Sequence, residues 1–128
     1  MAVVLDASAV IAALLGERGG EVIDAYSETA ALATVNLSEA VSALADHGFA
    51  PETAFALIVE TRVEIVPFDA QLALDAAAMK PLTRRAGLSL GDRACLALAR
   101  RRGLAAITAD RAWSAVADAV GVEIILIR

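Results

Sequence analysis

Short apolar runs alternate with longer amphipathic segments along the whole chain. Residues 2–5 form a continuous apolar run that ends at Asp6, a pattern typical of a buried parallel strand that leads into a helix, here at residues 7–15. Similar runs predict further strands at residues 31–34, 63–66, 105–108 and 122–127. Between them, helical periodicity predicts helices at residues 21–28, 37–46, 51–61, 69–79, 89–102 and 110–120.

Prolines and glycines set the expected limits of these elements. Pro51 fits the first turn of its helix, while Pro81 must end or kink the long helix that Asp69 can cap. Gly48 and Gly103 follow the last helical residues, as C-terminal glycines commonly do. The sequence contains no repeat, linker or low-complexity tract that would divide it.

Strands that alternate with helices predict parallel pairing through right-handed crossovers, with helices on both faces of the sheet. At 128 residues and 13.2 kDa, with 59% hydrophobic residues and a mean hydropathy of +0.65, the chain is expected to bury a real core as one domain. We therefore expect a single α/β domain over residues 1–128, with a central parallel sheet of four to five short strands.

The scarcity of cysteine and histidine excludes several kinds of site. Cys95 is the only cysteine and His47 the only histidine, so neither a disulfide nor a Cys/His zinc site is expected. Residues 1–6 lack the basic start of a signal peptide, and no apolar stretch reaches membrane-spanning length. These features predict a cytoplasmic protein without a membrane partner. Neither common glycine-rich phosphate loop occurs, which argues against nucleotide-driven chemistry.

Charge is divided unevenly between the two parts of the chain. The net charge is −5, yet residues 1–79 carry −10 and residues 80–128 carry +5. An acidic protein can therefore still present a basic surface to a nucleic acid. We place Arg84, Arg85, Arg93 and Arg111 around the expected site as RNA contacts. For the run 100–102, RNA contact and simple solvation of a helix end remain equally open.

Four acids stand where strands lead into helices: Asp6, Glu39, Asp92 and Asp110. Each could merely cap a helix, and the segments 36–39 and 89–92 both resemble capping boxes. Carboxyl ends of parallel strands share one sheet edge, however, and four acids gathered there would repel one another unless a cation compensates them. Mg²⁺ is the natural compensator, because it prefers hard oxygen ligands and serves phosphodiester hydrolysis.

Polar neighbours of these acids have two possible roles. Ser8 and Thr108 lie two residues from Asp6 and Asp110, close enough to orient a carboxylate or a metal-bound water, although Ser8 could equally cap a helix. For Asn36 we favour helix capping over an orienting role. His47 is expected to cap a helix end, Cys95 to be a small buried hydrophobe and Trp113 to anchor the last helix.

Four segments in the order D-x-S, E, D and T-x-D resemble the PIN-domain family, and more closely VapC-type toxins. They are residues 3–9, 36–40, 88–99 and 107–110, and the resemblance runs from residue 1 to residue 128. It implies a Mg²⁺- or Mn²⁺-dependent endoribonuclease, usually a homodimer, that is neutralised by a cognate antitoxin. By the family match, Asp6 and Asp92 are expected to bind the metal directly. Glu39 and Asp110 would act on a second ion or through metal-bound water.

Three alternatives remain at this stage. One is a PIN-type nuclease without a toxin role, either an RNA-processing or a DNA-directed enzyme, and another is a PIN-like fold that binds RNA or protein without cleavage. The third is a receiver-like signalling domain, which should place a lysine near the site. The only lysine is Lys80, at the end of a predicted helix, which argues against the receiver-like alternative.

Overall fold

The computed structural model describes residues 2–128 and contains one five-stranded sheet in which every neighbouring pair is parallel. The strand order is β3-β2-β1-β4-β5. The strands are β1 (Val3–Leu5), β2 (Ala30–Ala33), β3 (Glu64–Val66), β4 (Ala105–Thr108) and β5 (Ile124–Leu126). The expectation of an α/β fold with a parallel sheet of four to five short strands is thus confirmed.

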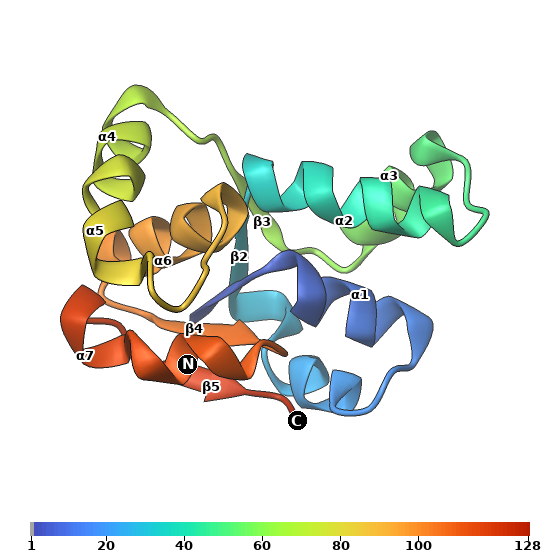
Figure 1. The fold of residues 1–128 in the computed structure, drawn as a ribbon. Coiled ribbons are helices and arrows are strands. Elements are labelled where there is room, and N and C mark those ends of the chain that lie inside the picture. Colours follow the sequence, from blue (N-terminus) through green and yellow to red (C-terminus); the bar gives the residue numbers. More distant parts are fainter. Residues whose placement is uncertain (1) are drawn as a thin grey trace.

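Helical segments join the strands and cover both faces of the sheet (Figure 1). The α-helices are α1 (Ala7–Leu15), α2 (Thr34–Asp46), α3 (Pro51–Glu60), α4 (Ala70–Ala78), α5 (Lys80–Thr83), α6 (Leu90–Arg102) and α7 (Ala117–Val120). Three 3-10 segments complete the fold: η1 (Gly20–Ala25), η2 (Ser27–Thr29) and η3 (Arg111–Ala115). No helix within residues 2–128 is long and apolar enough to cross a membrane.

Alternate side chains of the strands enter two separate cores. Val3 and Leu5 of β1 pack with α1, α2 and α3 on one face, while Val4 packs with α4, α6 and α7 on the other. Figure 1 shows these helix groups on opposite sides of the sheet. Because both faces are covered, the inner strands β1, β2 and β4 consist almost entirely of buried apolar residues, and Asp6 and Asp110 follow β1 and β4 at the sheet edge.

The central strand β1 lies between β2 and β4, so the strand order reverses there. The chain leaves β1 toward β2 and β3 on one side, and only later returns to place β4 and β5 on the other side. In open parallel sheets, ligands bind outside the carboxyl ends of the strands at such a reversal. The segments that follow β1 and β4 therefore mark the position at which a site is expected.

Three helix predictions were wrong in detail. The predicted helix at residues 21–28 consists of η1 and η2, because Tyr26 (φ −120°, ψ −2°) departs from helical geometry. The predicted helix at residues 110–120 is η3 followed by α7, with a similar break at Val116 (φ −110°, ψ −5°). The helix expected from residue 37 begins at Thr34, after the extended residue Ala33, so that Asn36 lies inside its first turn.

Candidate functional site

Asp6 follows β1 directly and caps α1, where its carboxylate accepts three hydrogen bonds. The Ser8 hydroxyl (2.7 Å) and the Ala9 backbone N–H (2.9 Å) donate to Oδ1, and the Thr108 hydroxyl (2.5 Å) donates to Oδ2. The residue is only 5% exposed. Helix capping therefore accounts for one of the three bonds, and the two hydroxyls account for the others.

Both hydroxyls are themselves fixed by the segment that follows β4. The Ala109 N–H donates to Ser8 Oγ (2.9 Å), and the Asp110 N–H donates to Thr108 Oγ1 (3.0 Å). A hydroxyl has a single proton to donate. Each of these hydroxyls donates it to Asp6 and accepts a hydrogen bond from a backbone N–H. The carboxylate is thus held rigidly where β1 and β4 end side by side.

Burial makes the negative charge of Asp6 costly. Loss of solvent raises its pKa from the ordinary 3.8 to about 6, against the hydrogen bonds from Thr108, Ser8 and the Ala9 N–H, which lower it. The negative charge of Asp92 makes a smaller contribution to this raised pKa, in the same direction as burial. A bound cation would relieve both the lost hydration and this repulsion.

Glu39 lies on α2 and is held against the start of α6. The buried Asn36 amide donates from Nδ2 to Glu39 Oε1 (3.1 Å) and to the Gly91 carbonyl (2.9 Å). Desolvation raises the pKa of Glu39, the Asn36 hydrogen bond lowers it, and the charge of Asp92 raises it. The expectation that Asn36 caps α2 was wrong, since this residue lies within the helix and bridges α2 to α6.

Asp92 forms the expected capping box at the start of α6. The Ser89 N–H donates to Asp92 Oδ2 (2.8 Å), and the Asp92 N–H donates to Ser89 Oγ (3.2 Å). One carboxylate oxygen is thereby bound to the backbone. Among residues 2–128, no hydrogen bond to Oδ1 is found, so this oxygen remains for a ligand.

The buried thiol of Cys95 shows that three acids share one neighbourhood. Burial raises the pKa of Cys95 well above its ordinary value, and the charges of Asp6, Asp92 and Glu39 raise it further. Cys95 lies one turn after Asp92 on α6, fully enclosed in the core. The charges of Asp6, Glu39 and Asp92 therefore all act on the first turns of this helix.

Asp110 is linked to the other three only indirectly. Its exposed side chain caps η3 through Oδ1, which accepts from the Ala112 N–H (2.9 Å). Its own N–H donates to Thr108 Oγ1, the group that binds Asp6. Asp110 thus stands next to the site, with a capping function already satisfied.

The donor set fits a divalent ion bound by few protein ligands. Within the part of the chain that the structure describes, no three side chains of His, Cys, Asp or Glu are placed to enclose a metal. Mg²⁺ commonly uses only one or two carboxylates and completes its shell with water and substrate phosphates. The buried carboxylate of Asp6 and the available Oδ1 of Asp92 meet that requirement in number and in chemistry.

The four arginines expected to contact RNA differ in exposure. Arg84 and Arg85 are exposed in the turn before α6, and Arg111 is exposed beside Asp110. Arg93 contradicts its expected role, because it is only 9% exposed and its Nη1 donates to the Ala76 carbonyl of α4 (3.0 Å). Its guanidinium is a packing element between α4 and α6, directed away from solvent.

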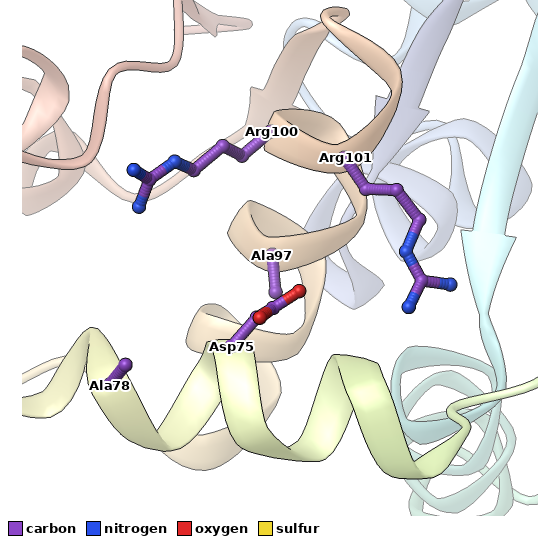
Figure 2. Close-up of a pocket in the computed structure, with 5 residues that line it drawn as sticks. All are labelled: Asp75, Ala78, Ala97, Arg100 and Arg101. Atoms are coloured by element: carbon purple, nitrogen blue, oxygen red, sulfur yellow. The ribbon is translucent and has the colours of Figure 1, made fainter.

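At the far end of α6, arginines mostly serve the fold. Arg101 makes two hydrogen bonds to Asp69 (3.1 and 3.0 Å), and Arg102 makes two to Glu64 (2.7 and 2.8 Å). A hollow of about 380 Å³ lies beside them, between α4 and α6, and Figure 2 shows the residues that line it. It is lined by Asp75, Ala78, Ala97, Arg100 and Arg101, and none of the four candidate acids reaches it.

Three other conspicuous residues have the expected structural roles. His47 is the C-cap of α2, and its Nδ1 lies 2.9 Å from the Ala43 carbonyl oxygen. Cys95 on α6 and Trp113 on η3 are fully buried in the same core. Gly91, whose carbonyl binds Asn36, was not identified from the sequence as a site residue. A glycine within a predicted helix lowers helix stability relative to alanine, and this could have marked the position as special.

The comparisons with known proteins agree with this architecture. The family model described as the PIN domain matches residues 3–119. The fold resembles VapBC-5 of the VapBC toxin-antitoxin family from Mycobacterium tuberculosis, with 26% identity over 98% of this chain and 99% of that one, and a TM-score of 0.65. It also resembles DNA-bound VapBC from Salmonella typhimurium (20% identity, 100% and 99% coverage, TM-score 0.74).

A toxin-antitoxin complex from Klebsiella pneumoniae has the same fold, with 16% identity, coverage of 99% of this chain and 98% of that one, and a TM-score of 0.75. No curated protein sequence matches the chain. Matches that cover nearly the full length of both chains show that the whole of this domain shares the fold.

Proposed function

Because the chain belongs to the PIN domain family, we propose that it is a Mg²⁺-dependent endoribonuclease that acts as the toxin of a toxin-antitoxin pair. The likeness to VapBC complexes supports the toxin role. The observation that carries the nuclease role is the buried carboxylate of Asp6, oriented by two hydroxyls where β1 and β4 end. Burial of a negative charge is unfavourable unless a positive charge compensates it, and Asp6 has no cationic side chain among its hydrogen-bond donors. A divalent ion would supply that compensation.

Asp6 and Asp92 are the proposed direct metal ligands, and Mn²⁺ is expected to substitute for Mg²⁺. Ser8 and Thr108 keep both oxygens of Asp6 in fixed directions, so that little reorganisation accompanies binding. Glu39 and Asp110 would act on a second ion or through bound water. When bound, the metal supplies the Lewis acidity that hydrolysis of a phosphodiester needs.

Metal dependence provides the direct test of this function. The purified protein should cut RNA internally with millimolar Mg²⁺ or Mn²⁺ and should lose this activity in EDTA. At ten times its Kd, a metal bound only by the folded state adds about 1.4 kcal/mol of stability, which is about 4 °C in Tm. Absence of RNA cleavage with either metal would contradict the proposal.

The toxin role predicts a protein partner and a place of action. We propose a cytoplasmic homodimer that a cognate antitoxin inhibits. Expression of the chain alone should arrest growth, and co-expression with its genomic neighbour should restore it. Cleavage in vitro without growth arrest would instead identify an RNA-processing nuclease without a toxin role.

The exposed arginines before α6 are expected to bind RNA phosphates. Replacing Arg84 and Arg85 together by Ala should weaken RNA binding, because fewer counterions are released. For a single-stranded probe in EDTA, the slope of log K against log salt should become shallower by about 1.4. Fluorescence anisotropy at four salt concentrations measures this slope, and Mg²⁺ affinity should stay unchanged.

Arg100→Ala is the matched control for this experiment. Arg100 is also exposed but lies at the opposite end of α6 from Asp92. Its replacement should leave the salt slope at the wild-type value. A double variant of Arg84 and Arg85 with an unchanged slope would assign these arginines to the antitoxin surface or to solvation.

A further inference from the structure

Asn36 makes a contact that helix formation does not require. Its side chain is fully buried in the first turn of α2, and both Nδ2 hydrogens are used, one on Glu39 Oε1 and one on the Gly91 carbonyl. Both partners are acceptors, which fixes the orientation of the amide group. The amide oxygen Oδ1 is buried and has no hydrogen-bond partner within residues 2–128. The Asn36 side chain is therefore oriented so that its NH₂ group binds both acceptors, while its own oxygen is left without a hydrogen bond.

Gly91 leaves the space that the same carboxylate occupies. A Cβ added at Gly91 would overlap Glu39 Oε1, Oε2 and Cδ, so that any larger residue would displace the carboxylate. Gly91 lies in the first turn of α6, immediately before Asp92. The Glu39 carboxylate thus accepts from the amide of Asn36 and occupies the space that a side chain at position 91 would need.

We propose that Asn36 and Gly91 are positioning residues that together fix the Glu39 carboxylate beside Asp92 at the start of α6. Asn36 and Gly91 are 55 residues apart in the sequence, and a hydrogen bond from the Asn36 side chain to the Gly91 carbonyl joins them. Glu39 lies on an exposed part of α2. Without the hydrogen bond from Asn36, its side chain could therefore adopt other rotamers. The inference rests on the proposed nuclease function, and it concerns which neighbours give Glu39 its working geometry.

Gly91→Ala is the decisive variant, because Ala suits a helix better than Gly and the Gly91 φ angle is not positive. The folded protein should therefore keep its Tm, while the added methyl group displaces the Glu39 carboxylate. We expect kcat for RNA cleavage to fall 10- to 100-fold, the range found for residues that orient metal ligands, with KM for RNA unchanged. Asn36→Ala should produce the same split between kcat and KM. Ser42→Ala, on the exposed side of α2, should leave both constants unchanged.

A double variant separates displacement of Glu39 from any other effect of the methyl group. Glu39→Asp shortens the side chain and leaves room for the new Cβ. Adding Gly91→Ala to Glu39→Asp should therefore cause no further loss, whereas an unrelated effect would multiply the two losses. Multiplied losses, or a wild-type kcat in Gly91→Ala, would overturn the proposal.

Binding of Mn²⁺ alone tests the inference independently of RNA cleavage. Isothermal titration of the full chain with MnCl₂ should show affinity about 10-fold weaker for Gly91→Ala than for wild type, with no further weakening when this change is added to Glu39→Asp. If the wild type binds Mn²⁺ but cleaves no RNA, the proposed function fails while this measurement still decides the role of Asn36 and Gly91. Equal Mn²⁺ affinity in wild type and Gly91→Ala would overturn the proposed positioning role of Asn36 and Gly91.

Discussion

Replacing Asp6 by Asn should lower Mg²⁺-dependent RNA cleavage at least about 100-fold and leave the fold intact. Loss of a group that only orients a metal ligand costs 10- to 100-fold, and loss of the ligand charge itself should cost no less. Asn retains an oxygen that can accept from Ser8 and the Ala9 N–H, so the cap of α1 is preserved. Cleavage rates with saturating Mg²⁺, together with circular dichroism, measure the two parts of this expectation.

The same variant has a pH signature that a simple helix cap would not have. In the folded state the pKa of Asp6 is raised by burial from 3.8 to about 6. Between these values the unfolded chain releases the proton first, so stability falls as the pH rises through this window and stays lower above it. The shift corresponds to about 3 kcal/mol. Asn cannot ionise and is free of this loss.

Thermal unfolding in EDTA at pH 4 and pH 8 therefore tests the burial of the Asp6 charge. The difference in unfolding free energy between Asp6→Asn and wild type should grow by about 2.5 kcal/mol in favour of Asn between the two pH values, because part of the effect is already present at pH 4. Any constant packing cost of the amide cancels in this comparison. A difference that is the same at both pH values, or full nuclease activity in the variant, would remove Asp6 from the site.

Asp92→Asn is the second change with a large expected effect, because Asp92 has one oxygen in a capping box and one available for a ligand. The amide oxygen of Asn can still accept from the Ser89 N–H, so α6 should lose only about 0.5 kcal/mol through the missing charge at its N-terminus. Cleavage should be abolished, and the rise in Tm that Mg²⁺ produces should disappear. Melting curves with 0 and 10 mM MgCl₂ measure the latter.

Ser89→Ala separates the structural role of the capping box from its chemistry. This change removes the hydroxyl that accepts from the Asp92 N–H and leaves the Ser89 N–H that holds the carboxylate. It should cost about 1 kcal/mol of stability and keep both cleavage and the Mg²⁺-dependent rise in Tm. If Asp92 were only a cap, the two variants would behave alike, with lowered Tm and preserved activity.

Several features of the fold depend on local chemistry, and these are the ones that the sequence predicted correctly. Apolar runs specify buried strands, and Asp69, Pro51 and Gly103 mark helix ends through interactions with residues nearby in the chain. The position of Asp6 after the first strand also follows from local pattern. Because parallel strands end at one edge, the sequence also predicted that Asp6 would lie beside the end of the fourth strand, where Thr108 binds it.

The arginines show where charge patterning stops being informative. Arg93 stands one residue from Asp92, yet helix rotation directs its side chain into the contact between α4 and α6. Arg84 and Arg85 stay at the surface because they lie in a turn. Sequence proximity to a candidate ligand therefore did not determine which arginines face solvent, since successive helical residues point in different directions.

The sequence by itself determined which residues end the strands and begin the helices, and so which acids come to the edge of the sheet. Only the tertiary structure decided how they are held, because the contacts of Thr108 with Asp6 and of Asn36 with Gly91 join residues 102 and 55 positions apart. The raised pKa of Asp6 was also decided by the tertiary structure, since it depends on burial by packed elements from the whole chain. Local pattern specifies positions along an element, whereas desolvation and long-range hydrogen bonds arise only after the elements pack.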